Sequence, residues 1–258
     1  ACEDKSAPTL EKIHNKYYLR FSFTETVTLS DTPIAEQIIC AVDLGINTDA
    51  VCSIMKADGT ILARKFIDFA SDKDRMIHAM NRTRRKQSKY GPKSARGLWA
   101  YVKRLNEDRA KKISAAIVEF ASQHSVDTIV MEHLDFKGCK KRGSKAQRLS
   151  MWNHGIIREK VEQKAHLLGI RIATICAWKT SALAFDGSGS VTRDDNNHAL
   201  AKFTTGKQYN CDLSASYNIG ARYFIRELLK SLPATEESRV KAKVPDAGRR
   251  TSCTLSTL

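Results

Sequence analysis

The stretch IICAVDLGINTDAVCSIMKADGTILARKFID at residues 38–68 predicts three consecutive strands of one sheet. IICAVDLG and AVCSIMKA are apolar runs of strand length, and TILARKFID is rich in β-branched and aromatic residues. Ala57, Asp58 and Gly59 separate the second run from the third, and an Asp-Gly pair between such runs is a strong signal for a tight hairpin turn. We therefore expect an antiparallel meander at the start of the sheet.

Helical spacing follows over residues 73–124 and is interrupted near Gly91 and Pro92, which predicts two helices joined as a hairpin. The second helix carries an apolar face that we expect to pack on the sheet, formed by Leu98, Val102, Leu105, Ile113 and Ile117.

The remainder of the chain alternates between strand and helix. VDTIVMEHLDF (126–136) predicts a short strand parallel to the first, and residues 154–170 predict an amphipathic helix that ends at Gly169. The run IRIATIC then predicts another strand, a polar stretch covers 179–211, and a last helix spans 212–232. The order β-β-β-α-β-α-β predicts an α/β fold with a mixed sheet.

The N-terminal run YYLRFSFTETVTL (17–29) also predicts a strand. Because a single strand is not stable alone, we expect it to end a preceding β-domain, followed by a linker at Asp31, Thr32 and Pro33.

Charge is the most informative part of the composition. The chain has 43 basic and 28 acidic residues, a net charge of +15. Residues 73–112 alone contain 14 Lys or Arg against three acids. A helical face that only needs solvation would mix the two signs, whereas a one-sided surplus suits the neutralisation of phosphates. We therefore expect nucleic acid as a partner.

Other features of the composition exclude several classes of protein. Hydrophobic residues make up 42% of the chain, and no apolar run approaches the roughly 20 residues that span a bilayer, so we expect no membrane span. The seven cysteines contain no Cys-x-x-Cys pair, which argues against a disulfide scaffold and an intact zinc ribbon. No signal peptide opens the chain, and we expect a cytoplasmic protein.

Three acids occupy positions where a site can form. Asp43 ends the first sheet strand, Glu132 ends its expected parallel neighbour, and Asp212 opens the last helix. Ligand sites form at the carboxyl ends of adjacent parallel strands. Close acids repel one another unless cations are present, and oxygen ligands suit Mg²⁺ or Mn²⁺, so we expect a metal site that cleaves phosphodiesters with two ions.

Each acid also has a simpler interpretation. Asp212 suits the N-cap of a helix, and Asp43 before Leu-Gly is also found in the phosphate-binding hairpin of sugar kinases and actin-like ATPases. Glu132 directly follows the apolar run TIVM, where a carboxylate is costly to bury unless it is paired or metal-bound. His133 beside it is interpreted as a neighbour rather than a ligand.

The motifs AVDLGIN (41–47), IVMEHLDF (129–136) and CDLSASYNIGARY (211–223) resemble the three RuvC motifs of TnpB proteins, the OrfB-type transposon-associated nucleases, which type V CRISPR effectors share. This resemblance implies an RNase H-like fold, one DNA-cutting site with Mg²⁺ or Mn²⁺, and a guide RNA. It matches Asp43, Glu132 and Asp212 to the catalytic, metal-binding positions.

The same resemblance suggests a domain organisation. We expect the end of an N-terminal β-barrel and a linker at 1–34, a RuvC core at 35–175 with the basic insertion 73–124, a ribbon-like nucleic-acid-binding insertion at 176–211, the last RuvC helix at 212–232 and a flexible tail at 233–258. In the family a four-cysteine zinc ribbon precedes the third motif. Here only Cys211 remains, so zinc is not supported, and we expect packing of Phe185, Val191, Phe203 and Tyr209 to hold the hairpin.

The leading hypothesis is a metal-dependent, RNA-guided DNA endonuclease of a transposable element, and the alternative is a nuclease-inactive binding or regulatory module. A sugar-kinase or actin-like ATPase is the third hypothesis, which the basic segment disfavours. The expected nucleic-acid contacts are Arg82, Arg84, Arg85, Lys86, Lys89, Lys93, Arg96, Lys140, Lys141, Arg142, Arg193 and Lys207.

Overall fold

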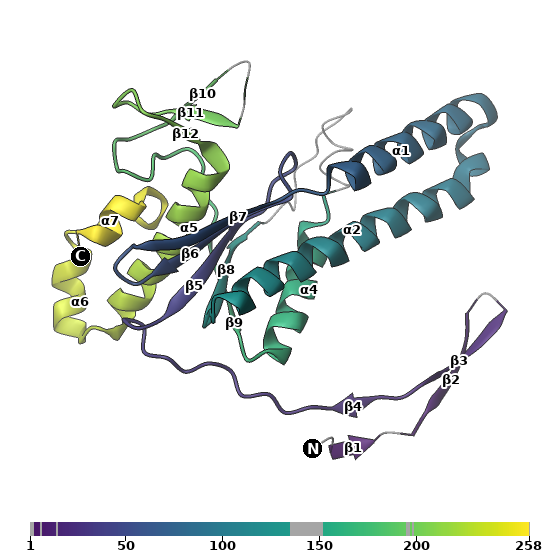
Figure 1. The fold of residues 1–258 in the computed structure, drawn as a ribbon, viewed down its shortest axis with the longest axis horizontal. Helices are drawn as coiled ribbons and strands as arrows, with labels where there is room; N and C mark the ends of the chain where they lie inside the picture. The colour runs from purple at the N-terminus through teal and green to yellow at the C-terminus, as the bar shows by residue number, and fades with distance from the viewer. Residues whose placement is uncertain are drawn as a thin grey trace.

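The computed structural model describes residues 3–5, 7–13, 15–134, 152–194, 197 and 199–257. Its centre is a five-stranded sheet of order β7-β6-β5-β8-β9 (Figure 1). β5, β6 and β7 are antiparallel neighbours, whereas β8 runs parallel to β5, and β9 parallel to β8. This confirms the mixed sheet. The strands are β5 (Ile38–Asp43), β6 (Ala50–Lys56), β7 (Ile61–Ile67), β8 (Thr128–His133) and β9 (Arg171–Cys176).

The turn between β6 and β7 is the hairpin that the Asp-Gly pair predicts. The amide of Gly59 donates to the carbonyl of Lys56 at 3.0 Å, and Gly59 has φ +84°, a conformation that a side chain would oppose. Asp58 accepts a hydrogen bond from the amide of Thr60 at 2.8 Å. The residues of the turn therefore determine the hairpin between β6 and β7.

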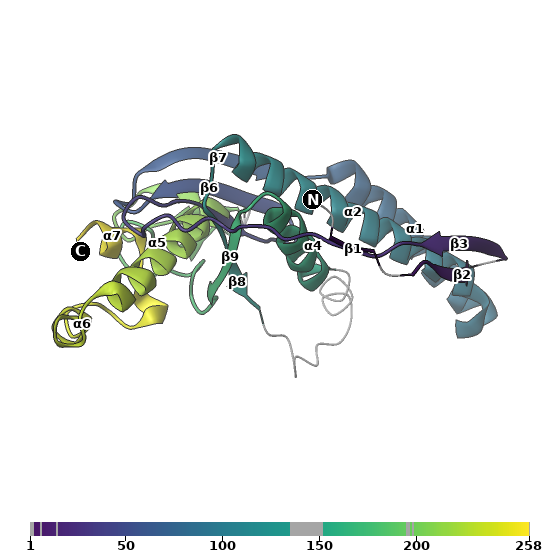
Figure 2. The same ribbon diagram turned by 90° about the horizontal axis from the view of Figure 1, so that it is seen from below.

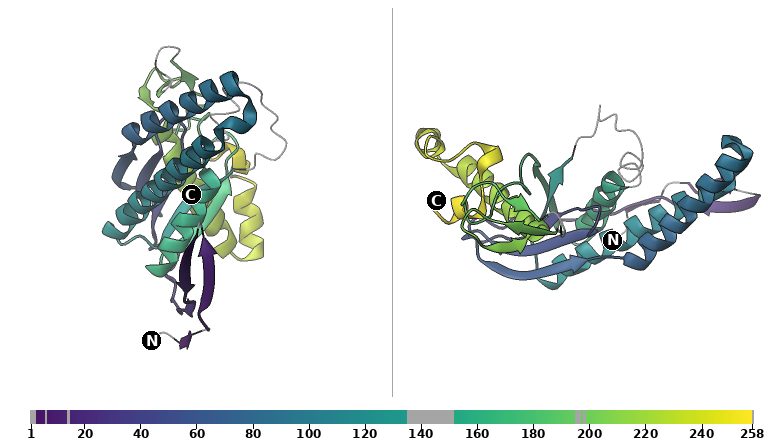
Figure 3. Two further views of the ribbon diagram at one scale, coloured as in Figure 1. Left: turned by 90° about the vertical axis from the view of Figure 1, so that its right-hand side faces the viewer. Right: turned by 90° about the horizontal axis from the view of Figure 1, so that it is seen from above.

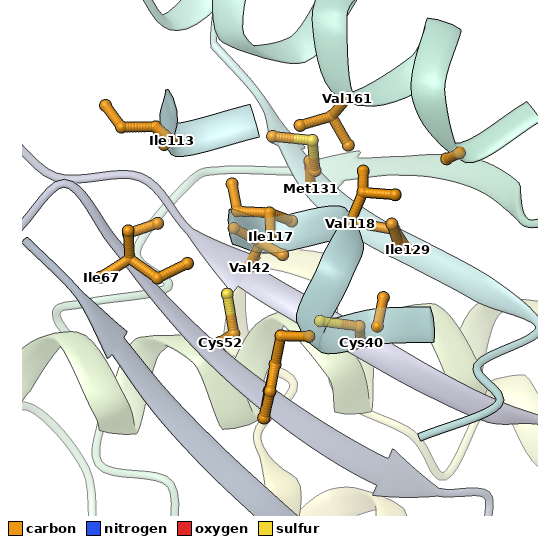
Figure 4. Close-up of a cluster of buried hydrophobic side chains, with 14 of the residues drawn as sticks. Cys40, Val42, Cys52, Ile67, Ile113, Ile117, Val118, Ile129, Met131 and Val161 are labelled. Atoms are coloured by element: carbon orange, nitrogen blue, oxygen red, sulfur yellow. The ribbon is translucent and has the colours of Figure 1, made fainter. Parts of the chain in front are cut away.

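Helices cover both faces of the sheet, as Figures 2 and 3 show. α2 (Arg96–Gln123) and α4 (His154–Leu167) lie on one face, and α5 (Cys211–Ser231) lies on the other. The side chains of β5 alternate between the two cores: Cys40 and Val42 pack with Ile117 of α2 (Figure 4), whereas Ile39 and Ala41 pack with α5. Both faces of β5, at the centre of the sheet, are therefore buried, as is usual for a strand with a parallel neighbour.

The predicted helical hairpin is confirmed, with α1 (Ala70–Tyr90), the short 3₁₀ helix η1 (Pro92–Ala95) and α2. Only the second half of α2 packs on the sheet, through Ile113 and Ile117. Val102, which we expected on the same face, instead packs against Met76 and Met80 of α1. The prediction was wrong there because α2 extends beyond the sheet and needs α1 to cover its first half, as Figure 1 shows.

A small second sheet precedes α5. It consists of β10 (Thr192–Arg193), β11 (Leu200–Lys202) and β12 (Gln208–Asn210), all antiparallel. Phe203 is buried beneath it, with Phe185, Val191 and Tyr209 packed around it. This packing of the four apolar residues is the one expected from the sequence. The relation of this sheet to a zinc ribbon stays a prediction.

The N-terminal residues form two narrow ribbons rather than one long strand. β2 (Thr9–Ile13) pairs with β3 (Lys16–Arg20), and β1 (Glu3–Lys5) pairs with β4 (Phe23–Thr24). The predicted strand over 17–29 is therefore wrong in extent. All five residues of β3 are exposed, so this strand does not pack against another layer that would stabilise a longer one.

The C-terminal residues, expected to be a flexible tail, form α6 (Ala234–Lys241), the 3₁₀ helix η2 (Ala247–Arg249) and α7 (Ser252–Ser256). Leu255 is buried in the α5 core, and Val240 and Val244 pack at its edge. Three well-spaced apolar residues thus anchor a segment whose composition is otherwise polar. Across the ranges described, no helix combines the length and apolarity needed to cross a membrane.

Candidate metal and nucleic-acid site

Asp43 and Glu132 lie side by side at the carboxyl ends of β5 and β8. The last pair in the register of these strands is Val42 with Met131, and the two acids follow directly. Side chains alternate along a strand, and Ala41 and Val130 point into the core beneath α5. Asp43 and Glu132 therefore project onto the face that α5 covers, while His133 points the other way and is exposed.

Asp212 comes to the same place from the start of α5. The N-cap of this helix is Asn210, whose side chain accepts the amide of Leu213 at 2.9 Å. The N-cap interpretation of Asp212 is therefore wrong, and its carboxyl group is available to the site. Gly220 allows α5 to approach β5 closely, because a Cβ there would lie 3.2 Å from the Ala41 Cβ.

The three carboxyl groups influence one another. Burial raises the pKa of Asp43 well above its ordinary value, and the charges of Glu132 and Asp212 raise it further. Burial also raises the pKa of Glu132 and that of Asp212. A cluster that resists ionisation in this way is stabilised by any cation that enters it.

Hydroxyl groups orient two of the three acids. Thr180 donates its hydroxyl to Glu132 Oε1, and a hydrogen bond from Thr48 lowers the pKa of Asp212. The backbone carbonyl of Thr180 in turn accepts Asn218 Nδ2 at 3.0 Å, and Asn218 is fully buried in α5. Glu132 is therefore held by contacts that run from the segment after β9 to α5.

Two arginines supply positive charge at this site. Arg193 on β10 is exposed, and its guanidinium charge lowers the pKa of both Asp43 and Asp212. Arg222, which is 4% exposed, lowers the pKa of Glu132. Positive charge thus already compensates part of the repulsion among the carboxylates.

Three carboxylates suit a divalent cation by their chemistry, since hard cations prefer oxygen ligands. In the described ranges, no group of three or more His, Cys, Asp or Glu side chains is arranged to hold one metal ion as it stands. The carboxylate oxygens are therefore the type of ligand that Mg²⁺ or Mn²⁺ prefers, but the three side chains would need to move closer together to bind one ion.

The seven basic residues predicted on the helical hairpin are all exposed, but they are not at the carboxylates. They occupy the outer part of α1, η1 and the start of α2, and the 21-residue α1 is about 30 Å long. We expected them near the cleft between the acids, whereas the structure places them along the outer part of the hairpin, and their role in binding nucleic acid stays a prediction. Figure 1 shows this end of the hairpin projecting beyond the sheet. These seven residues, called the hairpin tip below, are Arg82, Arg84, Arg85, Lys86, Lys89, Lys93 and Arg96.

The remaining predicted nucleic-acid contacts are Lys207 and three residues that follow β8 in the sequence. The Nζ of Lys207 lies 4.7 Å from the ring centre of Phe185 and 5.3 Å from that of Tyr209, so it covers the aromatic cluster. Lys140, Lys141 and Arg142 lie outside the described residues.

Sequence reasoning missed four residues of this site, namely Thr48, Thr180, Asn218 and Arg222. Asn218 and Arg222 belong to the motif CDLSASYNIGARY, and a polar residue on an otherwise apolar helix face is a signal that could have found them. Thr180 lies 48 positions from the carboxylate that it contacts, and nothing in its neighbourhood indicates that contact.

Several solved structures share the architecture, while no family model and no curated protein matches the sequence. The Cas12f1–sgRNA–target DNA complex has 18% identity and a TM-score of 0.54, covering 81% of this chain and 54% of that chain. The CRISPR-Cas12f ternary complex has 17% identity and a TM-score of 0.50, covering 82% and 44%. The AacC2c1–sgRNA binary complex has 11% identity and a TM-score of 0.54, covering 73% and 39%.

The chain thus spans about half or less of the length of these three structures. At such identities the likeness shows the fold alone. The chain therefore has a mixed α/β sheet and shares its fold with these three structures, and its assignment to the RNase H-like, RuvC type stays a prediction.

Proposed function

We propose that this chain is the catalytic part of a metal-dependent DNA endonuclease of the transposon-associated, RNA-guided type, resembling TnpB. The observation that carries the proposal is the convergence of Asp43, Glu132 and Asp212 from β5, β8 and α5 at one end of the sheet. The hairpin tip supports it, because exposed arginines and lysines of one sign suit a phosphate backbone. Similarity to complexes that contain sgRNA and target DNA supports guide RNA and DNA as partners.

In this mechanism the three carboxylates would hold Mg²⁺ or Mn²⁺, which would activate water and stabilise the leaving oxygen of the phosphodiester. Thr180 keeps the Glu132 carboxylate oriented toward the site, and Thr48 does the same for Asp212. Arg193 brings positive charge to the place where negative charge develops on the phosphate. Sequence choice would come from base pairing with a guide, because carboxylate-held metal and arginine side chains would act on phosphates, which are the same for every sequence.

The test is cleavage of labelled single-stranded and double-stranded DNA with Mg²⁺ and with EDTA. Glu132→Gln should abolish cleavage while DNA binding stays intact, because the amide keeps the shape and loses the charge. His133→Gln is the matched control, since this neighbouring side chain points to the opposite face, and it should cleave normally. Full cleavage by Glu132→Gln would defeat the assignment.

A nuclease-inactive binding module is the second candidate. The specific observation in its favour is that Arg193 already compensates Asp43 and Asp212, while the described acids are not arranged to share one ion. Salt-sensitive DNA binding without cleavage in either Mg²⁺ or Mn²⁺ would favour this candidate.

A further inference from the structure

A basic cavity lies between the segment after β9 and the C-terminal helices, in a part of the chain that the proposed catalysis does not use. Its volume is about 850 Å³, within the range of ligand-binding pockets. Residues 179–190 form one wall, and residues 240–257 form the other. We call this space the C-terminal cavity.

The lining of the C-terminal cavity has one sign of charge. Lys179, Lys243 and Arg249 face it, and no aspartate or glutamate is among its described lining residues. In the part of the chain that the structure describes, none of these three cations forms an ion pair with a carboxylate. Three uncompensated cations around one concave space focus a positive potential into it, which favours an anion.

Hydrogen-bonding groups accompany these charges. Ser190, Thr254 and Thr257 also line the cavity, so hydroxyl donors stand next to the ammonium and guanidinium groups. Phosphate contacts in nucleic-acid complexes come from this mixture of Lys, Arg, Ser and Thr side chains. The chemistry of the wall therefore fits phosphate oxygens better than an apolar ligand.

The cavity adjoins the carboxylate site through the chain itself. Lys179 directly precedes Thr180, whose hydroxyl donates to Glu132. The preceding residue, Trp178, is 58% exposed, and the Nζ of Lys179 lies 4.6 Å from its ring centre. An exposed indole beside a cation offers a surface on which a base can stack.

The far wall is held in place by buried contacts. Arg222 donates to the carbonyls of Gly248 at 3.1 Å and Arg250 at 3.2 Å, and also to that of Trp178 at 2.8 Å. The amide of Ser252 donates to Asn218 Oδ1 at 3.2 Å. One buried arginine thus ties both walls together, so the cavity is part of the fold.

We propose that the C-terminal cavity binds phosphates of a single nucleic-acid strand that extends from the carboxylate site. The inference deepens the proposed function and rests on it, because it names a second contact for the same nucleic acid. Lys179, Lys243 and Arg249 neutralise the phosphates, and Trp178 stacks with a neighbouring base.

The test measures binding of a fluorescent oligothymidylate by anisotropy in EDTA, so that cleavage plays no part. The double substitution Lys243→Gln and Arg249→Gln should weaken binding several-fold and reduce the slope of log affinity against log salt by about 0.7 for each lost phosphate contact. The matched control is Arg239→Gln with Lys241→Gln, which removes the same charge from exposed positions of α6 outside the cavity. Equal weakening by both pairs would overturn the proposal.

A second readout locates the strand without any substitution. Cys253 lines the cavity, so bound oligothymidylate should slow its alkylation, measured residue by residue with mass spectrometry. Unchanged alkylation of Cys253 at saturating oligonucleotide would overturn the proposal.

Three further outcomes separate the explanations. Competition by inorganic phosphate at concentrations equal to those of the oligonucleotide would identify a small-anion site and overturn the strand. Failure of the unmodified chain to bind the oligonucleotide at all would overturn the proposed function together with the inference. Normal binding with an unaffected double variant would overturn the inference alone.

Discussion

Asp43 carries the greatest electrostatic cost of the site, because its carboxyl group is buried beside two other acids. Its pKa in the folded chain lies above the unfolded value of about 3.9. While the Asp43 carboxyl group is protonated, its burial costs the folded chain little. The folded chain therefore has its full stability below that value and loses part of it as the pH rises through the folded pKa. Asp43→Asn removes this loss, and we expect its Tm at neutral pH without metal to exceed that of the unmodified chain.

The difference should widen as the pH rises from about 4 through the raised pKa of Asp43, which differential scanning fluorimetry can follow. Each kcal/mol gained corresponds to about 2–4 °C for a chain of this size. Asp74→Asn removes one charge from an exposed position of α1 and should leave Tm unchanged. A lower Tm for Asp43→Asn at neutral pH would contradict this electrostatic interpretation.

Gly45 is required by the turn that follows Asp43. A Cβ at this position would lie 2.5 Å from the carbonyl oxygen of Thr48, closer than atoms can approach. Because Thr48 also bonds Asp212, Gly45→Ala should displace that hydrogen bond, lower stability by about 1–3 kcal/mol and reduce cleavage. Thermal melting and a cleavage assay measure the two effects.

The control for Gly45 is Gly97→Ala, at an exposed position of α2 where a Cβ meets nothing within 4 Å. Alanine favours a helix over glycine, so this variant should be neutral or slightly more stable. Retention of wild-type stability and cleavage by Gly45→Ala would show that the turn can relax.

At the scale of elements, the helical hairpin separates nucleic-acid binding from the carboxylates. The hairpin-tip residues of α1 stand about 18–28 Å along the helix from its start at Ala70. Arg84→Gln, Arg85→Gln and Lys86→Gln together should therefore weaken DNA binding, lower its salt dependence and leave the turnover of bound DNA unchanged. Anisotropy against salt and single-turnover cleavage at saturating protein separate the two quantities.

An equal loss of charge elsewhere provides the comparison. Lys16, Lys56 and Lys230 are exposed on three other elements, and their triple substitution to glutamine should weaken binding less. If both triples weaken binding equally, only the net charge matters and the hairpin tip has no special role.

The sequence predicted these elements well where the signal is local. The Asp-Gly turn, the five core strands and the hairpin break at Gly91 each depend on neighbouring residues, and the alternation along β5 and β8 aims Asp43 and Glu132 at one face. Thr180 and Arg222 were not predictable in the same way. Their partners lie far along the chain and include backbone carbonyls, which carry no sequence signal.

At the scale of the whole molecule, the C-terminal segment closes over α5 instead of trailing as a flexible tail. Composition suggested the tail because apolar anchors are few, and only Leu255 is fully buried among them. What holds the segment is mostly backbone: the carbonyls of Gly248 and Arg250 satisfy the buried Arg222, and the amide of Cys253 donates to the carbonyl of Phe185 at 2.9 Å. A buried guanidinium without such acceptors would be costly.

A substitution at Gly248 tests how much the packing of the C-terminal segment on α5 stabilises the rest of the fold. A Cβ there would lie 2.0 Å from the Trp178 ring, so Gly248→Ala must push the C-terminal segment away from the segment that leads to Thr180. We expect a loss of about 1–3 kcal/mol in the free energy of unfolding and slower cleavage, because Thr180 orients Glu132. Gly155→Ala, in open space on α4, should do neither. If Gly248→Ala unfolds as the unmodified chain does, the C-terminal segment is not coupled to the site and the wall it gives to the C-terminal cavity is not rigid.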